Sequence, residues 1–82
     1  MTITLDWIKK QIKKTEFTKM GEKTTICVIT LQNDFEVVGT SACVDKNNFN
    51  HIIGENLAYD KAIEKIWELE GYWLQCKLHT EY

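Results

Sequence analysis

The chain has 82 residues and a formal net charge of −2, and 44% of its residues are hydrophobic and 27% charged. This is the composition of an ordinary globular domain, and the absence of proline argues against a linker or low-complexity segment. We therefore expect one domain over residues 1–82. A chain of this size buries only about 60% of the surface that it exposes when unfolded, so its core would benefit from a partner copy.

Three further classes of protein are disfavoured by the same data. No apolar run approaches the roughly 18 residues of a membrane span, and the start MTITLDWIKK lacks the order of a signal peptide, so we expect a soluble, intracellular protein. We therefore expect the three cysteines to be reduced thiols and not a disulfide framework. All ten basic residues are lysine, and residues 24–82, with four lysines and nine acidic residues, carry a charge of −5. Arginine supplies the fork favoured for phosphate and base recognition, so we do not expect nucleic-acid binding.

The N-terminal segment predicts a short amphipathic helix over residues 4–14. Apolar side chains recur at helical spacing from Leu5, Thr4 suits the N-cap, and Asp6 lies where the helix dipole favours a carboxylate. The outer face of this helix would carry Lys9, Lys10, Lys13 and Lys14. We interpret these lysines as a solvated face in preference to an anion-binding or DNA-binding patch.

Two β-branched runs, TTICVITL and FEVVGTSACV, predict an antiparallel β-hairpin with the dipeptide ND as its tight turn. A two-residue turn would place Val28 opposite Gly39 and would put Cys27 and Cys43 on opposite faces. Both faces of the first run are apolar, as in a strand that is covered on both sides. A two-stranded ribbon is not stable alone, so we expect another copy to continue or cover it.

The loop DKNNFN follows, with asparagine amides, Lys46 and an aromatic ring ahead of a helix N-terminus. These groups suit an anion or a nucleobase. Asp and Asn also serve turns and helix caps, and for any single residue of the loop we favour that role.

Residues 51 to about 79 predict a long helix with two apolar rows. The first row is Tyr59, Ala62, Ile66, Leu69, Trp73 and Cys76, and the second is Ile63, Trp67, Leu74 and Leu78. Together they are wider than one hairpin readily covers, which is typical of an interaction surface, although a plain core helix has the same pattern. Gly71 either ends this helix or lies inside it at a cost of about 1 kcal/mol. The fold class is therefore α+β, with a short N-terminal helix, an antiparallel hairpin and a long C-terminal helix, and we expect a homo-oligomer.

Catalytic motifs are missing from the sequence. His51 and His79 are the two histidines, and neither has a second ligand at metal-site spacing. A Ser41–His51 relay has no nucleophile elbow or oxyanion motif with it, and VVGTSAC lacks the glycines of a phosphate loop. We expect no catalytic activity, no cofactor and no metal.

The run FEVVGTSACVDKNNF, followed by KIWELEGY, carries a resemblance to a known family. It resembles small tailed-phage and prophage proteins that share a pattern close to F-x-V-V-G-x-S-A-C-V-D-x-x-N-F before a helix ending in K-I-W-x-L-E-G-Y, and the match covers residues 24 to 74. This family includes the first type of Thoeris anti-defence protein. Those proteins are oligomeric sponges that sequester a cyclic ADP-ribose isomer made by bacterial TIR enzymes, and some are hexamers that also hold cyclic oligonucleotides.

The resemblance implies a phage anti-defence sponge in the cytoplasm of the infected bacterial host, a dimer or hexamer that holds a nucleotide-derived signal without catalysis. The sponge sites use arginines on the ligand phosphates, and this chain has none, so Lys46, Lys61, Lys65 or Lys77 would have to substitute. On chemical grounds we expect a site between subunits. Its ligand-binding residues would be Asn48, Phe49, Asn56, Tyr59 and Lys61 of one copy with Trp73 and Lys77 of another. The alternative function is a protein–protein inhibitor or scaffold that acts on a host partner through the wide helix face.

Overall fold

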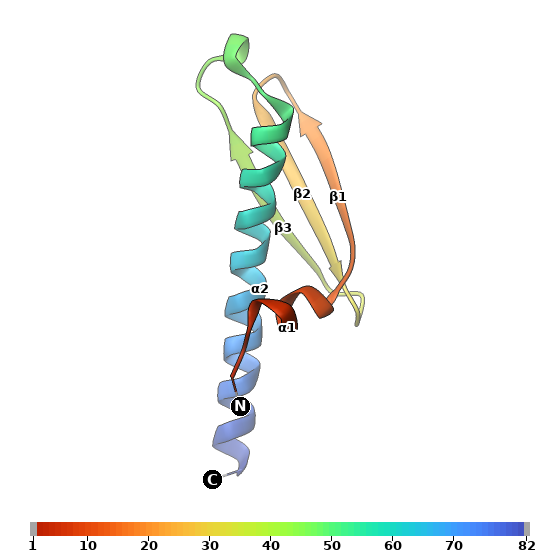
Figure 1. Ribbon diagram of the computed structural model, residues 1–82, viewed down its shortest axis with the longest axis vertical. Coiled ribbons are helices and arrows are strands. Elements are labelled where there is room, and N and C mark those ends of the chain that lie inside the picture. Colours follow the sequence, from red (N-terminus) through yellow and green to blue (C-terminus); the bar gives the residue numbers. More distant parts are fainter. Residues whose placement is uncertain (1, 82) are drawn as a thin grey trace.

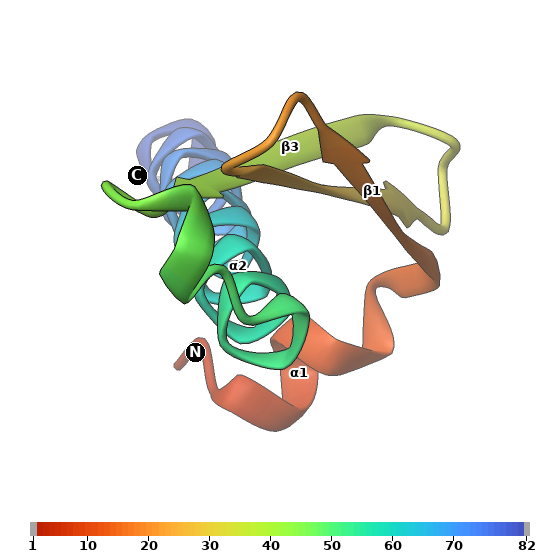
Figure 2. The same cartoon turned by 90° about the horizontal axis from the view of Figure 1, so that it is seen from above.

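The computed structural model describes residues 2–81. Its elements are α1 (Leu5–Lys10), β1 (Ile12–Met20), β2 (Thr24–Leu31), β3 (Glu36–Ala42), the 3₁₀ turn η1 (Lys46–Asn48) and α2 (His51–Glu81). The three strands form an antiparallel sheet in the order β1-β2-β3, and both α-helices lie on one side of it (Figure 1, Figure 2). The α+β fold is the predicted one, with a third strand added to the hairpin.

Helix α1 begins as the sequence predicts but is shorter. The Thr4 hydroxyl accepts a hydrogen bond from the Trp7 amide at 3.2 Å, Asp6 lies in the first turn, and Ile8 is fully buried in the core. The helix ends at Lys10, so the prediction of a helix to residue 14 is wrong. Lys13 and Lys14 lie in β1, not on a helical face with Lys9 and Lys10.

Strand β1 is the element that the sequence pattern did not predict. It is an edge strand with most of its side chains exposed, so it lacks the apolar alternation of a half-buried strand. Its register with β2 shifts between Ile12 and Lys14. Gly21, at φ +71°, begins the turn into β2 and is the local signal that indicates a strand end here.

The turn between β2 and β3 corrects the predicted register by one residue. Leu31 donates its amide to the Phe35 carbonyl at 2.8 Å, and Asp34 has φ +69°, so the loop holds three residues and not two. Gly39 therefore lies opposite Cys27, and Val38 opposite Val28. The prediction that Val28 faces Gly39 is wrong, and so is the prediction that Cys27 and Cys43 lie on opposite faces; both thiols are free.

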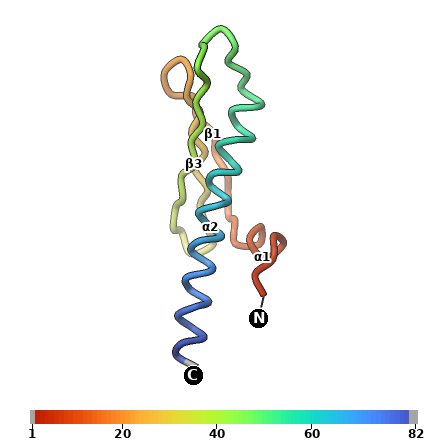
Figure 3. Tube along the Cα trace, turned by 90° about the vertical axis from the view of Figure 1, so that its left-hand side faces the viewer, coloured from red at the N-terminus to blue at the C-terminus, as the bar shows by residue number. Residues whose placement is uncertain are grey.

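Helix α2 has 31 residues and forms the long axis of the molecule (Figure 3). It begins after Asn50, whose side-chain oxygen accepts from the amides of Ile52 and Ile53 at 3.0 and 3.2 Å. It continues through Gly71, where an added Cβ would meet nothing within 4 Å. Of the two alternatives for Gly71, the structure thus has the glycine inside the helix.

The core lies between α2 and the inner face of the sheet. Ala58, Ala62 and Ile66 are fully buried against Cys27 and Ile29 of the central strand. Gly39 permits this packing, because a Cβ there would overlap with the backbone of α2 at Ala58 and Ala62. The first half of the predicted apolar row is therefore core.

Apolar side chains of residues 2–81 stay uncovered in several places in a single copy, two of which bear on function. The C-terminal half of α2 projects beyond the sheet in a molecule of 55 × 21 × 19 Å, and Leu69 and Trp73 are 41% and 53% exposed there (Figure 1). No helix of residues 2–81 covers the outer face of the sheet (Figure 2). Ile26 and Val28 are only half-buried. The sequence had indicated a strand covered on both sides, and one side remains open.

Candidate functional site

The seven predicted ligand-binding residues do not form one cluster within a single copy. Asn48 and Phe49 line a small hollow beside η1, Lys61 lines a groove beside β3, and Trp73 lines a third hollow with residues of α1 and of the β2–β3 turn. Tyr59 packs against the core, Asn56 is exposed, and Lys77 lies over the Trp73 ring. A site shared between copies stays a prediction.

The hollow beside η1 has a volume of about 170 Å³ and is bordered by Lys23, Ser41 and Phe49. The Lys19 ammonium lies 4.5 Å from the centre of the Phe49 ring. Polar side chains of the loop accept hydrogen bonds from backbone amides. Asp45 accepts from the Asn47 amide at 2.9 Å, and Asn50 accepts from the Ile52 amide at the start of α2. Turn and capping chemistry, which we favoured for single loop residues, accounts for these two side chains.

The groove beside β3 is lined mainly by charged side chains. Lys61 and Lys65 alternate there with Glu64 and Glu68 on α2. The Lys65 ammonium donates to the Val38 carbonyl on the free edge of β3. A lysine at a free strand edge disfavours pairing of that edge with another strand.

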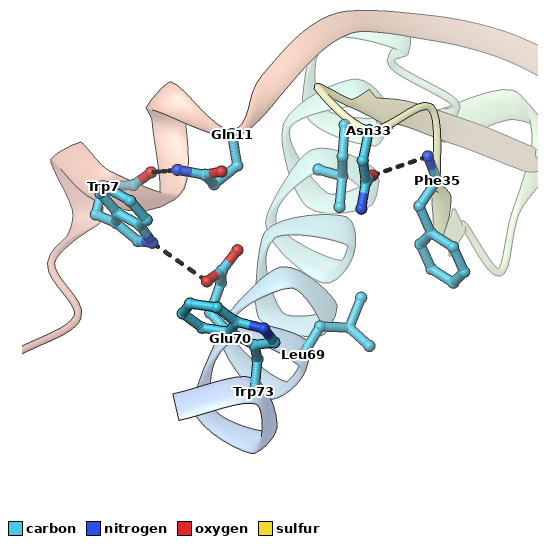
Figure 4. Close-up of a pocket in the computed structure, with 8 residues that line it drawn as sticks. Trp7, Gln11, Asn33, Phe35, Leu69, Glu70 and Trp73 are labelled. Carbon is cyan, nitrogen blue, oxygen red and sulfur yellow. Dashed lines mark hydrogen bonds between the residues drawn. The ribbon is translucent and has the colours of Figure 1, made fainter. Parts of the chain in front are cut away.

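A third hollow, which we name the aromatic groove, lies where α1, the β2–β3 turn and the projecting half of α2 meet (Figure 4). Its volume is about 380 Å³, within the range of small-molecule sites. Its lining residues are Trp7, Gln11, Leu31, Asn33, Phe35, Leu69, Glu70 and Trp73. Of these, the sequence analysis had selected Trp73 alone as a ligand contact.

Hydrogen bonds fix side chains on both walls of the aromatic groove, one of them between distant segments and two between near neighbours. The Trp7 indole Nε1 donates to Glu70 Oε2 at 3.2 Å, and Gln11 Nε2 donates to the Trp7 carbonyl at 3.2 Å. On the other wall, the Phe35 amide donates to Asn33 Oδ1 at 3.1 Å (Figure 4). The groove is thus bordered by residues from three separated segments of the chain.

Aromatic surface dominates the aromatic groove. Trp7, Phe35 and Trp73 are 45%, 54% and 53% exposed, and they gather around one hollow. Among the described residues that line the groove, Glu70 alone is ionisable, and the Lys77 ammonium lies 5.0 Å from the centre of the Trp73 ring. The lining therefore offers flat apolar surfaces and one carboxylate, and a lysine lies over one of its rings.

Sequence signals for this groove were partial. Leu69 and Trp73 are four residues apart on the predicted apolar row, so their common face was evident. Trp7 and Phe35 lie in other segments, and nothing local indicates that they approach α2. Their contribution became visible only in the fold.

The chemistry of the cysteines and acids does not indicate a nucleophile or a metal centre in residues 2–81. Cys27 is fully buried, and burial, followed by the nearby Glu55 carboxylate, raises the pKa of its thiol. Within the described part of the chain, no three His, Cys, Asp or Glu side chains are grouped as metal ligands. No helix of residues 2–81 has the length and hydropathy needed to cross a membrane.

Comparison with known proteins identifies the family to which this chain belongs. The model of the "Phage protein (N4 Gp49/phage Sf6 gene 66) family" matches residues 3–78. The match spans nearly the whole chain, so this protein belongs to that family of phage proteins, and the prediction of a small phage protein family is confirmed. No curated protein and no solved structure gives a match.

Proposed function

We propose that this phage protein is an anti-defence sponge that binds a nucleotide-derived immune signal, such as a cyclic ADP-ribose isomer or a cyclic oligonucleotide, in the cytoplasm of the infected host. It acts by sequestration, without catalysis. The observation that carries the proposal is the aromatic groove, with Trp7, Phe35 and Trp73 exposed around one hollow. Membership of a phage protein family and the resemblance to anti-defence sponges support it.

The lining of the aromatic groove suits a nucleobase. Stacking of a base on an aromatic side chain contributes about 1–3 kcal/mol, and every base offers a flat face for it. Three exposed aromatic rings in one hollow supply such faces, and Asn33, Gln11 and Glu70 supply polar groups at its walls. A base held there would be oriented by its edge as well as by stacking.

Phosphate groups would be neutralised by lysine. Lys77 stacks over Trp73, so its ammonium lies beside the aromatic groove, where a phosphate attached to a bound base would emerge. Lysine provides a mobile point charge and not the planar fork of arginine. We therefore expect binding that weakens with salt and that discriminates poorly between phosphate geometries.

Calorimetry with a panel of cyclic ADP-ribose isomers and cyclic di- and trinucleotides tests the proposal. We expect heat of binding with at least one compound. Heating the complex should release that compound intact, since sequestration leaves the ligand chemically unchanged. A panel without any heat, or the recovery of a cleaved compound, would contradict the sponge function.

We also propose that the protein works as a homo-oligomer whose copies cover the open sheet face. Ile26 and Val28 are apolar yet only half-buried there, and Val38 is 38% exposed beside them. The lysine at the edge of β3 disfavours continuation of the sheet through that strand, and packing of the open faces would cover these apolar side chains. Light scattering should give a mass above that of one chain at micromolar concentration. Val38→Lys should lower this mass, whereas Val44→Lys, in a loop position that is 94% exposed, should not.

A protein–protein inhibitor is the second candidate. It is favoured by the projecting half of α2, where Trp67, Tyr72 and Trp73 are 37%, 73% and 53% exposed. A pull-down that retains one host protein, together with no thermal shift from any cyclic nucleotide, would support this function over the sponge.

A further inference from the structure

The Glu70 carboxylate is placed to read the edge of a ligand in the aromatic groove. It is half-buried and lines the groove together with Trp7 and Trp73, and its Oε2 accepts a hydrogen bond from the Trp7 indole Nε1 at 3.2 Å (Figure 4). This bond orients the carboxylate and leaves acceptor sites on both oxygens, because each carboxylate oxygen can accept two hydrogen bonds. An ionised carboxylate accepts hydrogen bonds and donates none.

The charge of the groove disfavours several ligand edges. Among the described lining residues there is no lysine or histidine to balance Glu70, so a ligand edge rich in acceptors would meet uncompensated repulsion. An edge with two adjacent N–H donors would instead make a paired, charge-assisted contact. The occupant is thus selected by its donors as well as by its flat faces.

The four bases differ in this respect. Guanine presents its N1–H and N2–H₂ donors side by side on the Watson–Crick edge. Adenine and cytosine present one amine beside a ring-nitrogen acceptor, and uracil presents one N–H between two carbonyl oxygens. Only the guanine edge matches a carboxylate with two donors.

We propose that the aromatic groove binds a guanine base, with Glu70 as the specificity-determining residue that accepts from its N1–H and N2–H₂ groups. The proposal rests on the nucleotide-binding function proposed above and specifies the class of signal: a guanine-containing cyclic nucleotide. The ribose and phosphates extend out of the groove toward Lys77.

Calorimetry of the full chain with cyclic di-GMP and cyclic di-AMP tests this assignment, because the two probes share backbone, ring size and charge and differ in the base. A good bidentate contact to a base edge discriminates by about 1–3 kcal/mol, and we expect cyclic di-GMP to bind at least about tenfold more tightly. Glu70→Gln keeps an acceptor for Trp7 but adds a donor, which suits adenine. This variant should lose about tenfold in affinity for cyclic di-GMP while its affinity for cyclic di-AMP is unchanged or higher.

Glu68→Gln is the matched control, since it removes the same charge two residues away in the groove beside β3, and it should keep the guanine preference. Equal affinities for the two probes, or tighter binding of cyclic di-AMP, would overturn the guanine assignment and leave the sponge function standing. No binding of any nucleotide in the wider panel would overturn both. If a second copy occupies the groove instead, Trp73→Ala will lower the mass in light scattering and nucleotide affinities will not respond to Glu70→Gln, which also overturns the assignment.

Discussion

Gly39 of β3 lies directly against the backbone of Ala58 on α2. A Cβ at position 39 would overlap with the Ala58 carbonyl oxygen and the Ala62 amide nitrogen, which are main-chain atoms that cannot rotate away. The close approach of strand and helix is what buries Ala58, Ala62 and Cys27 completely. This contact sets how closely the long helix packs on the sheet.

Gly39→Ala should therefore be among the most destabilising small substitutions in the chain. Overpacking commonly costs about 1–3 kcal/mol, and because backbone must move here we expect a loss of about 3 kcal/mol or more in the free energy of unfolding, measured by urea denaturation. Gly71→Ala is the control. It adds the same methyl group to α2, the helix that packs against Gly39, at a position where nothing lies within 4 Å. Gly71→Ala should therefore raise the free energy of unfolding by about 0.5–1 kcal/mol. Similar effects at the two glycines would contradict the packing described.

Docking of α1 depends on Ile8. Its side chain is fully buried, so Ile8→Ala should lower the free energy of unfolding by about 2–5 kcal/mol through lost burial and a cavity. Leu5→Ala, on the same helix but at a position that is 49% exposed, should change it by no more than about 0.5 kcal/mol. Thermal or urea unfolding of both variants measures the difference, and a mild effect of Ile8→Ala would show that α1 does not belong to the core.

The Trp7 indole links α1 to α2 through Glu70, across 63 positions of sequence. Trp7→Phe keeps an aromatic ring and removes the donor, so we expect a loss of stability of no more than about 1 kcal/mol because the bond is solvent-exposed. Hydrogen exchange followed by mass spectrometry should show faster opening of residues 5–10. Trp67→Phe, at a tryptophan of α2 that does not line the groove, should leave this exchange unchanged. Unaltered exchange in Trp7→Phe would mean that the bond does not restrain α1.

The three cysteines should differ in reactivity. Burial raises the pKa of the Cys27 thiol, so at pH 8 it supplies less thiolate than an ordinary cysteine and is also inaccessible. Cys76 is exposed and Cys43 is half-buried. Alkylation followed by mass spectrometry should label Cys76 first and Cys27 last, and in urea the difference should vanish. Labelling of Cys27 at the rate of Cys76 in the folded protein would contradict its position in the core.

Local patterns account for the parts of the fold that were predicted correctly. The N-cap at Thr4, the β-branched runs of β2 and β3 and the apolar row of α2 all act between residues within a few positions of one another. Strand β1 was not predicted, because an edge strand buries few side chains and therefore lacks an apolar alternation. Its closely spaced lysines fit a helical face equally well. One extra residue in the β2–β3 turn was enough to exchange the partners of Gly39.

Local sequence patterns predicted only part of the aromatic groove. Leu69 and Trp73 were recognised as one apolar face, but the row that contains them is core at Ala62 and Ile66 and exposed beyond the end of the sheet. Which half is exposed depends on where α2 crosses the strands. The spacing of residues along the chain therefore determines the type of each element, its capping residues and the side chains that share one of its faces. These properties arise from contacts between near neighbours. The meeting of Trp7, Phe35 and Glu70 around one hollow depends on the packing of distant segments, and only the folded chain establishes it.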